Sequence, residues 1–168
     1  IDCHPNYETR EIIKEYDFKN TIEVQHHHAH MAACLADNEI DDESYAIILD
    51  GTGYGLDGNI WGFELFYGDC NHFKRLAHLQ YSALPGGEAC IREPWRNAVG
   101  MLISLLGEEG VKISEQLFPK RTKAIPVLQA MIDKNMNTVY GGTCGRLFDA
   151  VSSIVGLCET STYDGEAA

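Results

Sequence analysis

A continuous apolar run followed by a glycine-rich turn is the sequence feature that most limits the possible fold. Residues 45–49 are all apolar, Asp50 follows them, and three glycines alternate through Gly51-Thr52-Gly53-Tyr54-Gly55. Such a run is typical of a fully buried strand, and Asp50 would end it with its carboxylate at the strand's carboxyl edge. The glycines let backbone approach a ligand closely, although a structural hairpin turn explains them equally well.

Two further strands are expected after this turn. Apolar residues alternate over 60–67 and again over 73–79, with the turn residues 68–71 between them. Together with 45–49 they predict an antiparallel three-stranded β-meander. Helical periodicity and a short β-branched stretch predict the other elements, namely helices at 8–19, 26–36, 95–106 and 146–157, two shorter helices between 111 and 135, and a strand at 21–25. The fold class is therefore α/β, a meander followed by helices.

The charge balance limits the partners of such a domain. The 168 residues contain 13 Lys and Arg against 25 Asp and Glu, a net charge of −12. Residues 1–60 hold three basic and thirteen acidic residues, a net −10, so the N-terminal third carries most of the negative field. This field disfavours nucleic acid as a partner.

Hydrophobicity and cysteine content indicate where such a chain would be located. No apolar stretch reaches the roughly 18 residues of a membrane helix, so no membrane partner is expected. Six cysteines form no CxxC pair and several lie in apolar context, which favours a reducing, cytoplasmic environment. The chain begins with Ile1 and stops without a change of composition, so we expect a piece of a longer protein.

Four histidines within five residues, His26, His27, His28 and His30, are the strongest chemical signal. On the expected helix His26 and His30 are four residues apart, so they share one face, where two ring nitrogens can hold one metal ion. His27 and His28 point elsewhere on this helix. At least one more ligand must come from a distant segment. The alternative is a polar helix start whose histidines are incidental.

A second candidate segment lies near the end of the chain. Residues 141–145 are glycine-rich and predict a flexible loop, and the helix that follows could bind an anion through its first-turn N–H groups and Arg146. Asp149 could contact such a ligand or simply complement the helix dipole. The apolar side of this helix is expected at Leu147, Phe148, Val151, Ile154 and Val155.

Four ordered motifs together resemble the C-terminal region of the HypF carbamoyltransferases, which mature [NiFe] hydrogenases. They are Val24-Gln25-His26-His27-His28-Ala29-His30, the segment 49–62 that begins Leu49-Asp50-Gly51, Leu84-Pro85-Gly86-Gly87 with Ile91-Arg92-Glu93-Pro94-Trp95-Arg96, and Gly145-Arg146-Leu147-Phe148-Asp149. The resemblance runs from Asp2 to Gly165, nearly the whole chain. It is more specific than any single motif because all four occur in order at compatible spacing.

The resemblance implies an actin-like, sugar-kinase and Hsp70-type (RNase H-like) fold related to the tRNA threonylcarbamoyl transferase TsaD. Residues 1–168 would form part of the TsaD-like carbamoyl-transfer domain. Within it, 43–80 would be core strands, 84–136 a helical insertion, and 141–168 a substrate-side loop and helix.

The resemblance also implies a reaction. Upstream domains of the family convert carbamoyl phosphate and ATP into carbamoyl adenylate. The present region would pass the carbamoyl group to the C-terminal cysteine of HypE, toward the cyanide ligands of the hydrogenase. The upstream domains and HypE are therefore the expected partners. Alternatives are a related O-carbamoyltransferase, a tRNA threonylcarbamoyl transferase, or a catalytically silent metal-binding domain.

Site residues follow from the same resemblance. His26, His30 and Asp50 would be catalytic ligands of a divalent metal, which could be zinc, iron or magnesium. Gly51, Thr52 and Gly53 would line the adenylate phosphate, and Gly145 and Asp149 would contact the nucleotide. A fourth metal ligand, an aspartate, is expected beyond Ala168.

Overall fold

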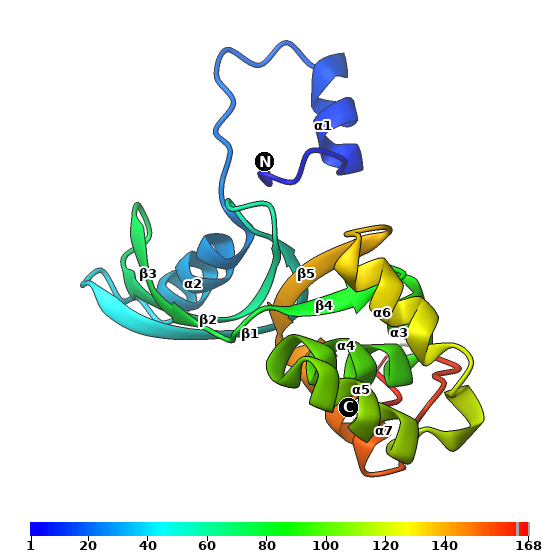
Figure 1. Ribbon diagram of the computed structural model, residues 1–168. Coiled ribbons are helices and arrows are strands. Elements are labelled where there is room, and N and C mark those ends of the chain that lie inside the picture. The colour runs from blue at the N-terminus through cyan, green and yellow to red at the C-terminus, as the bar shows by residue number, and fades with distance from the viewer. Residues whose placement is uncertain (164, 168) are drawn as a thin grey trace. The chain divides into compact units, whose positions relative to one another are not determined.

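The structure is a computed structural model that describes residues 1–163 and 165–167 and contains two compact units (Figure 1). The first unit is Ile1–His78 and the second is Leu79–Ala168. Asp164 and Ala168, which belong to the segment 141–168, lie outside the described residues.

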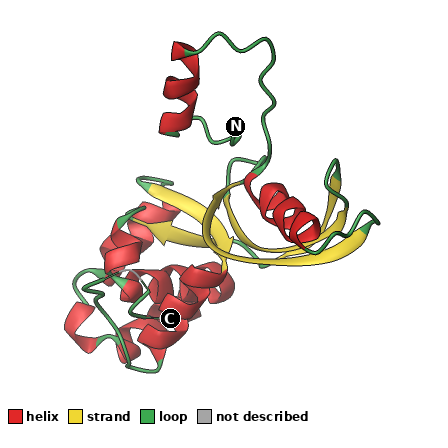
Figure 2. Ribbon diagram, turned by 180° about the vertical axis from the view of Figure 1, so that it is seen from behind, coloured by secondary structure: helices red, strands yellow, loops and turns green. Residues whose placement is uncertain are grey.

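The first unit contains the expected meander. Strand β2 (Ile60–Gly68) pairs antiparallel with β1 (Ser44–Tyr54) on one side and β3 (Phe73–His78) on the other. Helix α2 (His26–Asp37) lies against β1 (Figure 2). The first helix is shorter than expected, because α1 (Glu8–Ile12) passes into the 3-10 turn η1 (Ile13–Glu15). The expected strand 21–25 does not form; Val24 makes one isolated bridge, to Asp2.

Strand β1 differs from the expectation of a fully buried strand that ends at Asp50. It continues to Tyr54, and its side chains alternate between exposed and covered positions. Tyr45, Ile47 and Leu49 are 59–72% exposed, whereas Ile48 between them is 8% exposed. The expectation was wrong because successive residues of an antiparallel strand point to opposite faces, and only one face of β1 is covered in this unit.

The second unit is mainly helical. Its elements in chain order are β4 (Ser82–Pro85), α3 (Ala89–Arg92), α4 (Pro94–Leu106), α5 (Glu108–Leu117), η2 (Pro119–Arg121), α6 (Ile125–Asp133), β5 (Thr138–Thr143) and α7 (Cys144–Ile154). Strands β4 and β5, which the sequence did not predict, pair antiparallel from Ser82 opposite Gly141 to Pro85 opposite Thr138. Helix α4 confirms the expected helix at 95–106, and α6 confirms one of the two shorter helices expected between 111 and 135. The other, α5, begins earlier than expected, at Glu108.

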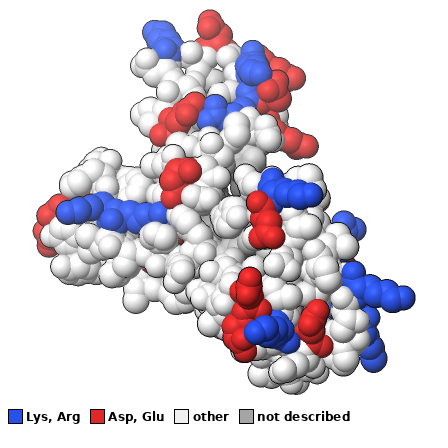
Figure 3. Space-filling model, viewed as in Figure 1, with Lys and Arg blue, Asp and Glu red and all other residues white. Residues whose placement is uncertain are grey.

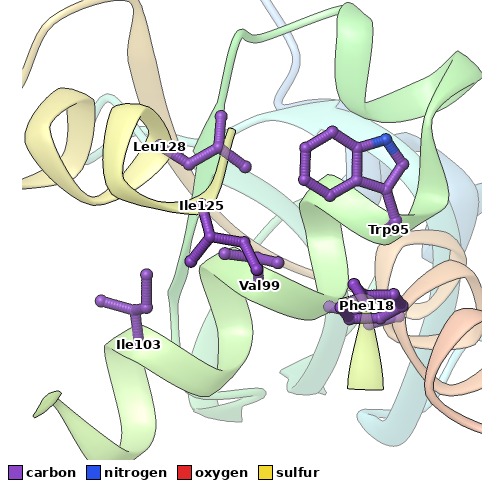
Figure 4. Packing of buried hydrophobic residues seen from close by; sticks show 8 residues of the cluster. Trp95, Val99, Ile103, Phe118, Ile125 and Leu128 are labelled. Atoms are coloured by element: carbon purple, nitrogen blue, oxygen red, sulfur yellow. The ribbon is translucent and has the colours of Figure 1, made fainter. Parts of the chain in front are cut away.

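The core of the second unit is built on α4 (Figure 4). Trp95, Val99 and Ile103 of this helix are at most 8% exposed and pack with a set of equally buried residues, Phe118, Ile125 and Leu128. Each such side chain contributes about 1.5–3 kcal/mol by leaving water. Gly100 lets α4 lie directly on β4, because a Cβ there would come within 2.0 Å of the Ala83 carbonyl oxygen.

Helix α7 corrects two expectations. No loop precedes it, since residues 141–143 belong to β5 and the helix starts at Cys144, where the Thr143 hydroxyl accepts a hydrogen bond from the Arg146 N–H (3.0 Å). The predicted apolar side is largely outside, with Phe148, Val151 and Val155 45–62% exposed. Small and polar residues form the buried side instead, and they let α7 pack closely on α4, namely Cys144, Asp149, Ala150, Ser152 and Ser153.

None of the described helices is long and apolar enough to cross a membrane. On the face drawn in Figure 3, acidic and basic side chains are interspersed.

Thiol labelling tests the burial pattern. All six cysteines are free; Cys34 and Cys70 are exposed, whereas Cys90 is 1% exposed and burial raises its pKa to about 12. At pH 8 only about one Cys90 side chain in ten thousand is a thiolate. We expect iodoacetamide to modify Cys34 and Cys70 in the folded chain and Cys90 only after unfolding, as followed by peptide mass spectrometry. Equal rates at Cys34 and Cys90 in the folded chain would contradict this packing.

Candidate metal centre

The first turn of α2 is fixed by the residue that precedes it. Gln25 is 4% exposed, and its side-chain oxygen caps the helix by accepting the His28 N–H (2.9 Å). Its side-chain NH₂ group donates to the carbonyl oxygen of Tyr54 (3.1 Å), at the end of β1. One buried amide therefore ties the histidine-bearing turn to the strand that carries Asp50.

Asp50 reaches this turn because β1 bulges. The ladder with β2 is regular up to Leu49 opposite Phe63 and resumes at Gly53 opposite Trp61. Three residues of β1 therefore lie opposite one of β2, and bulges of this kind redirect a side chain. Asp50 sits inside the bulge, rather than at the end of the strand as expected.

The three predicted metal ligands converge. One oxygen of Asp50, Oδ2, lies 3.3 Å from His26 Nε2 and 4.0 Å from His30 Nε2, and the two Nε2 atoms are 3.3 Å apart. All three atoms lie within 4.8 Å of one another. His26 is partly buried and His30 is exposed, so one side of the cluster is open to solvent.

His27 also faces Asp50, which corrects the expectation that it points elsewhere. Its ring is fully buried, with Nε2 3.2 Å from Asp50 Oδ2 and Nδ1 3.4 Å from the Gln25 Nε2. Because the Gln25 oxygen is taken by His28 N–H, its NH₂ group faces Nδ1 and donates to it. The His27 proton is then on Nε2, from which it donates to Asp50.

His28 points away from Asp50, as expected, and has a structural role. It is 7% exposed and its Nε2 lies 2.9 Å from the carbonyl oxygen of Asp69. A carbonyl only accepts, so Nε2 carries the proton. The ring also packs on Phe73, with centroids 4.8 Å apart.

The environment keeps Asp50 ionised. Burial raises its pKa, but the hydrogen bonds from His27 and from the Gly51 N–H (2.6 Å), with the positive charges that His27 and His26 carry once they are protonated in acid, lower it to about 2. An ionised carboxylate with two fixed oxygens is the form that binds a cation.

A group of interacting side chains behind His27, of which Trp61 and Glu64 are buried, was not predicted from the sequence. Trp61 stacks parallel to the His27 ring at 6.3 Å between centroids, and its Nε1 donates to Asp57 (2.8 Å). The Arg75 guanidinium lies 3.7 Å over the Trp61 ring and donates through Nε to the buried Glu64 (2.6 Å). The two acids and Arg75 come from separate turns and strands, so no local sequence pattern joins them.

The glycine-rich segment divides into two parts. A Cβ on Gly53 would lie 2.3 Å from His27 Cε1, so this glycine makes room for the histidine ring. A Cβ on Gly51 would meet nothing within 4 Å, and Thr52 is exposed. Gly51 and Thr52 thus leave open backbone beside Asp50, where the phosphate is expected, whereas Gly53 has a packing role.

Gly145 and Asp149 belong to the second unit. Gly145 is in the first turn of α7. Asp149 is 5% exposed; its Oδ2 accepts from Asn97 Nδ2 (3.1 Å) and pairs with Arg146 Nε (3.0 Å). This places its carboxylate within the packing of α4 and α7, beyond the role of complementing a helix dipole. Contact of either residue with a nucleotide stays a prediction.

Family models match most of the chain. Residues 46–168 match the model described as carbamoyltransferase, Kae1-like domain, second subdomain, and residues 1–37 match the HypF Kae1-like domain. The chain belongs to the HypF carbamoyltransferase family. The expected fold class is thereby confirmed as the mixed α/β, Kae1-like fold of this family.

Relatives and solved structures agree with this family. Carbamoyltransferase HypF2 of Cupriavidus necator is 40% identical over 99% of the chain, which spans 21% of that protein. A full-length HypF crystallised in a phosphate- and nucleotide-bound form is 36% identical, with a TM-score of 0.90 over 99% of the chain and 21% of its own. HypF of T. kodakarensis is 33% identical, with a TM-score of 0.81 over 98% of the chain and 23% of its own. The chain spans about a fifth of these proteins.

Two neighbouring glycines provide a matched test of the packing at the centre. Gly53→Ala should lower the free energy of unfolding by about 1–3 kcal/mol, because its methyl group overlaps the buried His27 ring. Gly51→Ala, which meets open space, should change it by less than about 0.5 kcal/mol. Urea unfolding followed by tryptophan fluorescence measures both. Equal losses for the two variants would contradict the described position of His27.

Proposed function

We propose that this chain forms the carbamoyl-transfer site of a HypF enzyme, passing the carbamoyl group of carbamoyl adenylate to the C-terminal cysteine of HypE. The product leads to the cyanide ligands of [NiFe] hydrogenase. The observation that carries the proposal is the convergence of His26, His30 and Asp50 within 4.8 Å in a chain of this family. Upstream domains would supply the adenylate, and the free cysteines suit a cytoplasmic setting.

The three side chains fit a divalent metal. Two imidazoles and a carboxylate are a common donor set for zinc or iron, and a magnesium ion could bind through the carboxylate and substrate phosphate. Ligands at about 2.0–2.1 Å from a tetrahedral ion lie about 3.3 Å apart. The observed separations of 3.3, 3.3 and 4.0 Å are close to this value.

Carbamoyl transfer needs negative charge to be stabilised on the AMP phosphate and on the carbamoyl carbonyl oxygen. The HypE thiolate forms a C–S bond with the carbamoyl carbon, and the bond from that carbon to the AMP phosphate oxygen breaks. A bound divalent cation supplies positive charge for the phosphate and the carbonyl oxygen. The chain's own residues keep the site ready for this step: His27 and the Gly51 N–H each hold one oxygen of Asp50. Gly51 and Thr52 leave room for the phosphate.

Removal of single histidines tests the metal site. His26→Ala or His30→Ala should weaken zinc binding by at least about 100-fold, since each removes one of three ligands. His72→Ala, which removes an imidazole 64% exposed and outside the centre, should leave the affinity unchanged. Competition with a chromophoric chelator measures the dissociation constants. Equal metal content in the wild type and both site variants would show that the site is misassigned.

Substitution of Asp50 tests the transfer step separately from adenylate formation. In a full-length protein that carries this chain, Asp50→Ala should reduce carbamoylation of HypE to below about 1%, because the centre loses its charged ligand. Pyrophosphate release from ATP and carbamoyl phosphate should continue. The mass of HypE and the pyrophosphate signal are the two readouts, with the exposed Asp41→Ala as control. Unchanged transfer by the Asp50 variant would refute the role.

A further inference from the structure

A carboxylate from the first residues of the chain lies behind His26. Asp2 Oδ2 is 2.7 Å from His26 Nδ1, the ring nitrogen that faces away from Asp50 and His30. The Asp2 side chain is 17% exposed, and its other oxygen, Oδ1, accepts the His4 N–H (2.7 Å). Both oxygens of Asp2 therefore have defined partners.

The backbone around Asp2 is fastened to the residues just before α2. Cys3 N–H donates to the Val24 carbonyl (3.0 Å), and Val24 N–H donates to the carbonyl of residue 1 (2.8 Å). Arg10 also holds this backbone in place, because its guanidinium donates hydrogen bonds to the carbonyl oxygens of Asp2, Cys3 and His4 at 2.8–3.3 Å. The carboxylate is thus held against the ring rather than brought there by a free chain end.

The distances decide which His26 nitrogen carries the proton. The pair with Asp2 is shorter (2.7 Å) than the pair with Asp50 (3.3 Å). Asp50 Oδ2 also already accepts from His27. A neutral imidazole has one N–H, and the shorter charge-assisted bond takes it. The proton belongs on Nδ1, which leaves the Nε2 lone pair directed at the centre.

We propose that Asp2 is a positioning residue of this centre, which fixes the tautomer and orientation of His26 so that Nε2 can bind a metal. The inference rests on the proposed function in assuming that the centre binds a metal. Carboxylates that accept the second N–H of a metal-binding histidine typically raise metal affinity by 10- to 100-fold. Residues 1–5 are thereby part of the site, although they lie more than twenty positions before the helix.

The Asp2→Asn variant gives a sharp test. The amide oxygen must stay with the His4 N–H, so the NH₂ group faces His26 Nδ1 and donates to it. The proton then moves to Nε2 and blocks the metal-binding lone pair. In the ¹⁵N-histidine-labelled 168-residue chain without metal, long-range ¹H–¹⁵N spectra should show His26 protonated on Nδ1 in the wild type and on Nε2 in the variant. Zinc affinity should fall about 10- to 100-fold.

A carboxylate variant outside the centre serves as the matched control. Glu43→Gln alters a carboxylate–histidine pair outside the centre, Glu43 with His72 at 3.1 Å, and should change neither the His26 tautomer nor zinc affinity. A wild-type His26 protonated on Nε2 overturns the proposal without any variant, as does Asp2→Asn with unchanged tautomer and affinity. A wild type that binds no zinc contradicts the proposed metal centre instead, so the two failures are distinguishable.

Discussion

In the first unit, one carboxylate oxygen of Asp50 lies close to three imidazole nitrogens, and the surrounding elements hold it there. Asp50 Oδ2 lies 3.2–4.0 Å from the Nε2 atoms of His26, His27 and His30. The contact requires a bulge in β1 to move Asp50 off the ladder and a helix that starts at His26. Because the bulge and the helix start are far apart in sequence, the Gln25 side chain, which bonds to both segments, holds them together.

A partly buried charge is stable only when hydrogen bonds or opposite charges compensate for the water it has lost. Around Asp50, each residue that does this is itself held by another residue behind it. His27 holds the carboxylate, Trp61 packs behind His27, and Arg75 covers Trp61 while it neutralises the buried Glu64. Together these contacts fix the position of the Asp50 carboxylate. Asp57, in the turn before β2, completes this arrangement by accepting the Trp61 Nε1 proton.

Sequence reasoning found the parts of the centre that depend on periodicity. Four-residue spacing is enough to put His26 and His30 on one face, and one apolar run followed by two alternating stretches is enough to predict the meander. It missed His27 because helical spacing says where a side chain points but not how near the next element comes. It overestimated the burial of β1 because an apolar run does not reveal which face is covered. The short strands β4 and β5 carry turn residues and glycines, so their pairing depends on the packing of α4.

The contacts of Asp2 connect the stability of the N-terminal segment to the centre. Residues 1–5 contribute no buried apolar side chain, and they are held by backbone hydrogen bonds to Val24, by Arg10 and by the pair with His26. A ligand that binds only the assembled centre stabilises every segment that shapes it, by RT ln(1 + [L]/Kd). In the proposed metal centre, metal binding and the order of the segment before α2 are therefore thermodynamically linked, because this segment provides the carboxylate that holds His26 Nδ1.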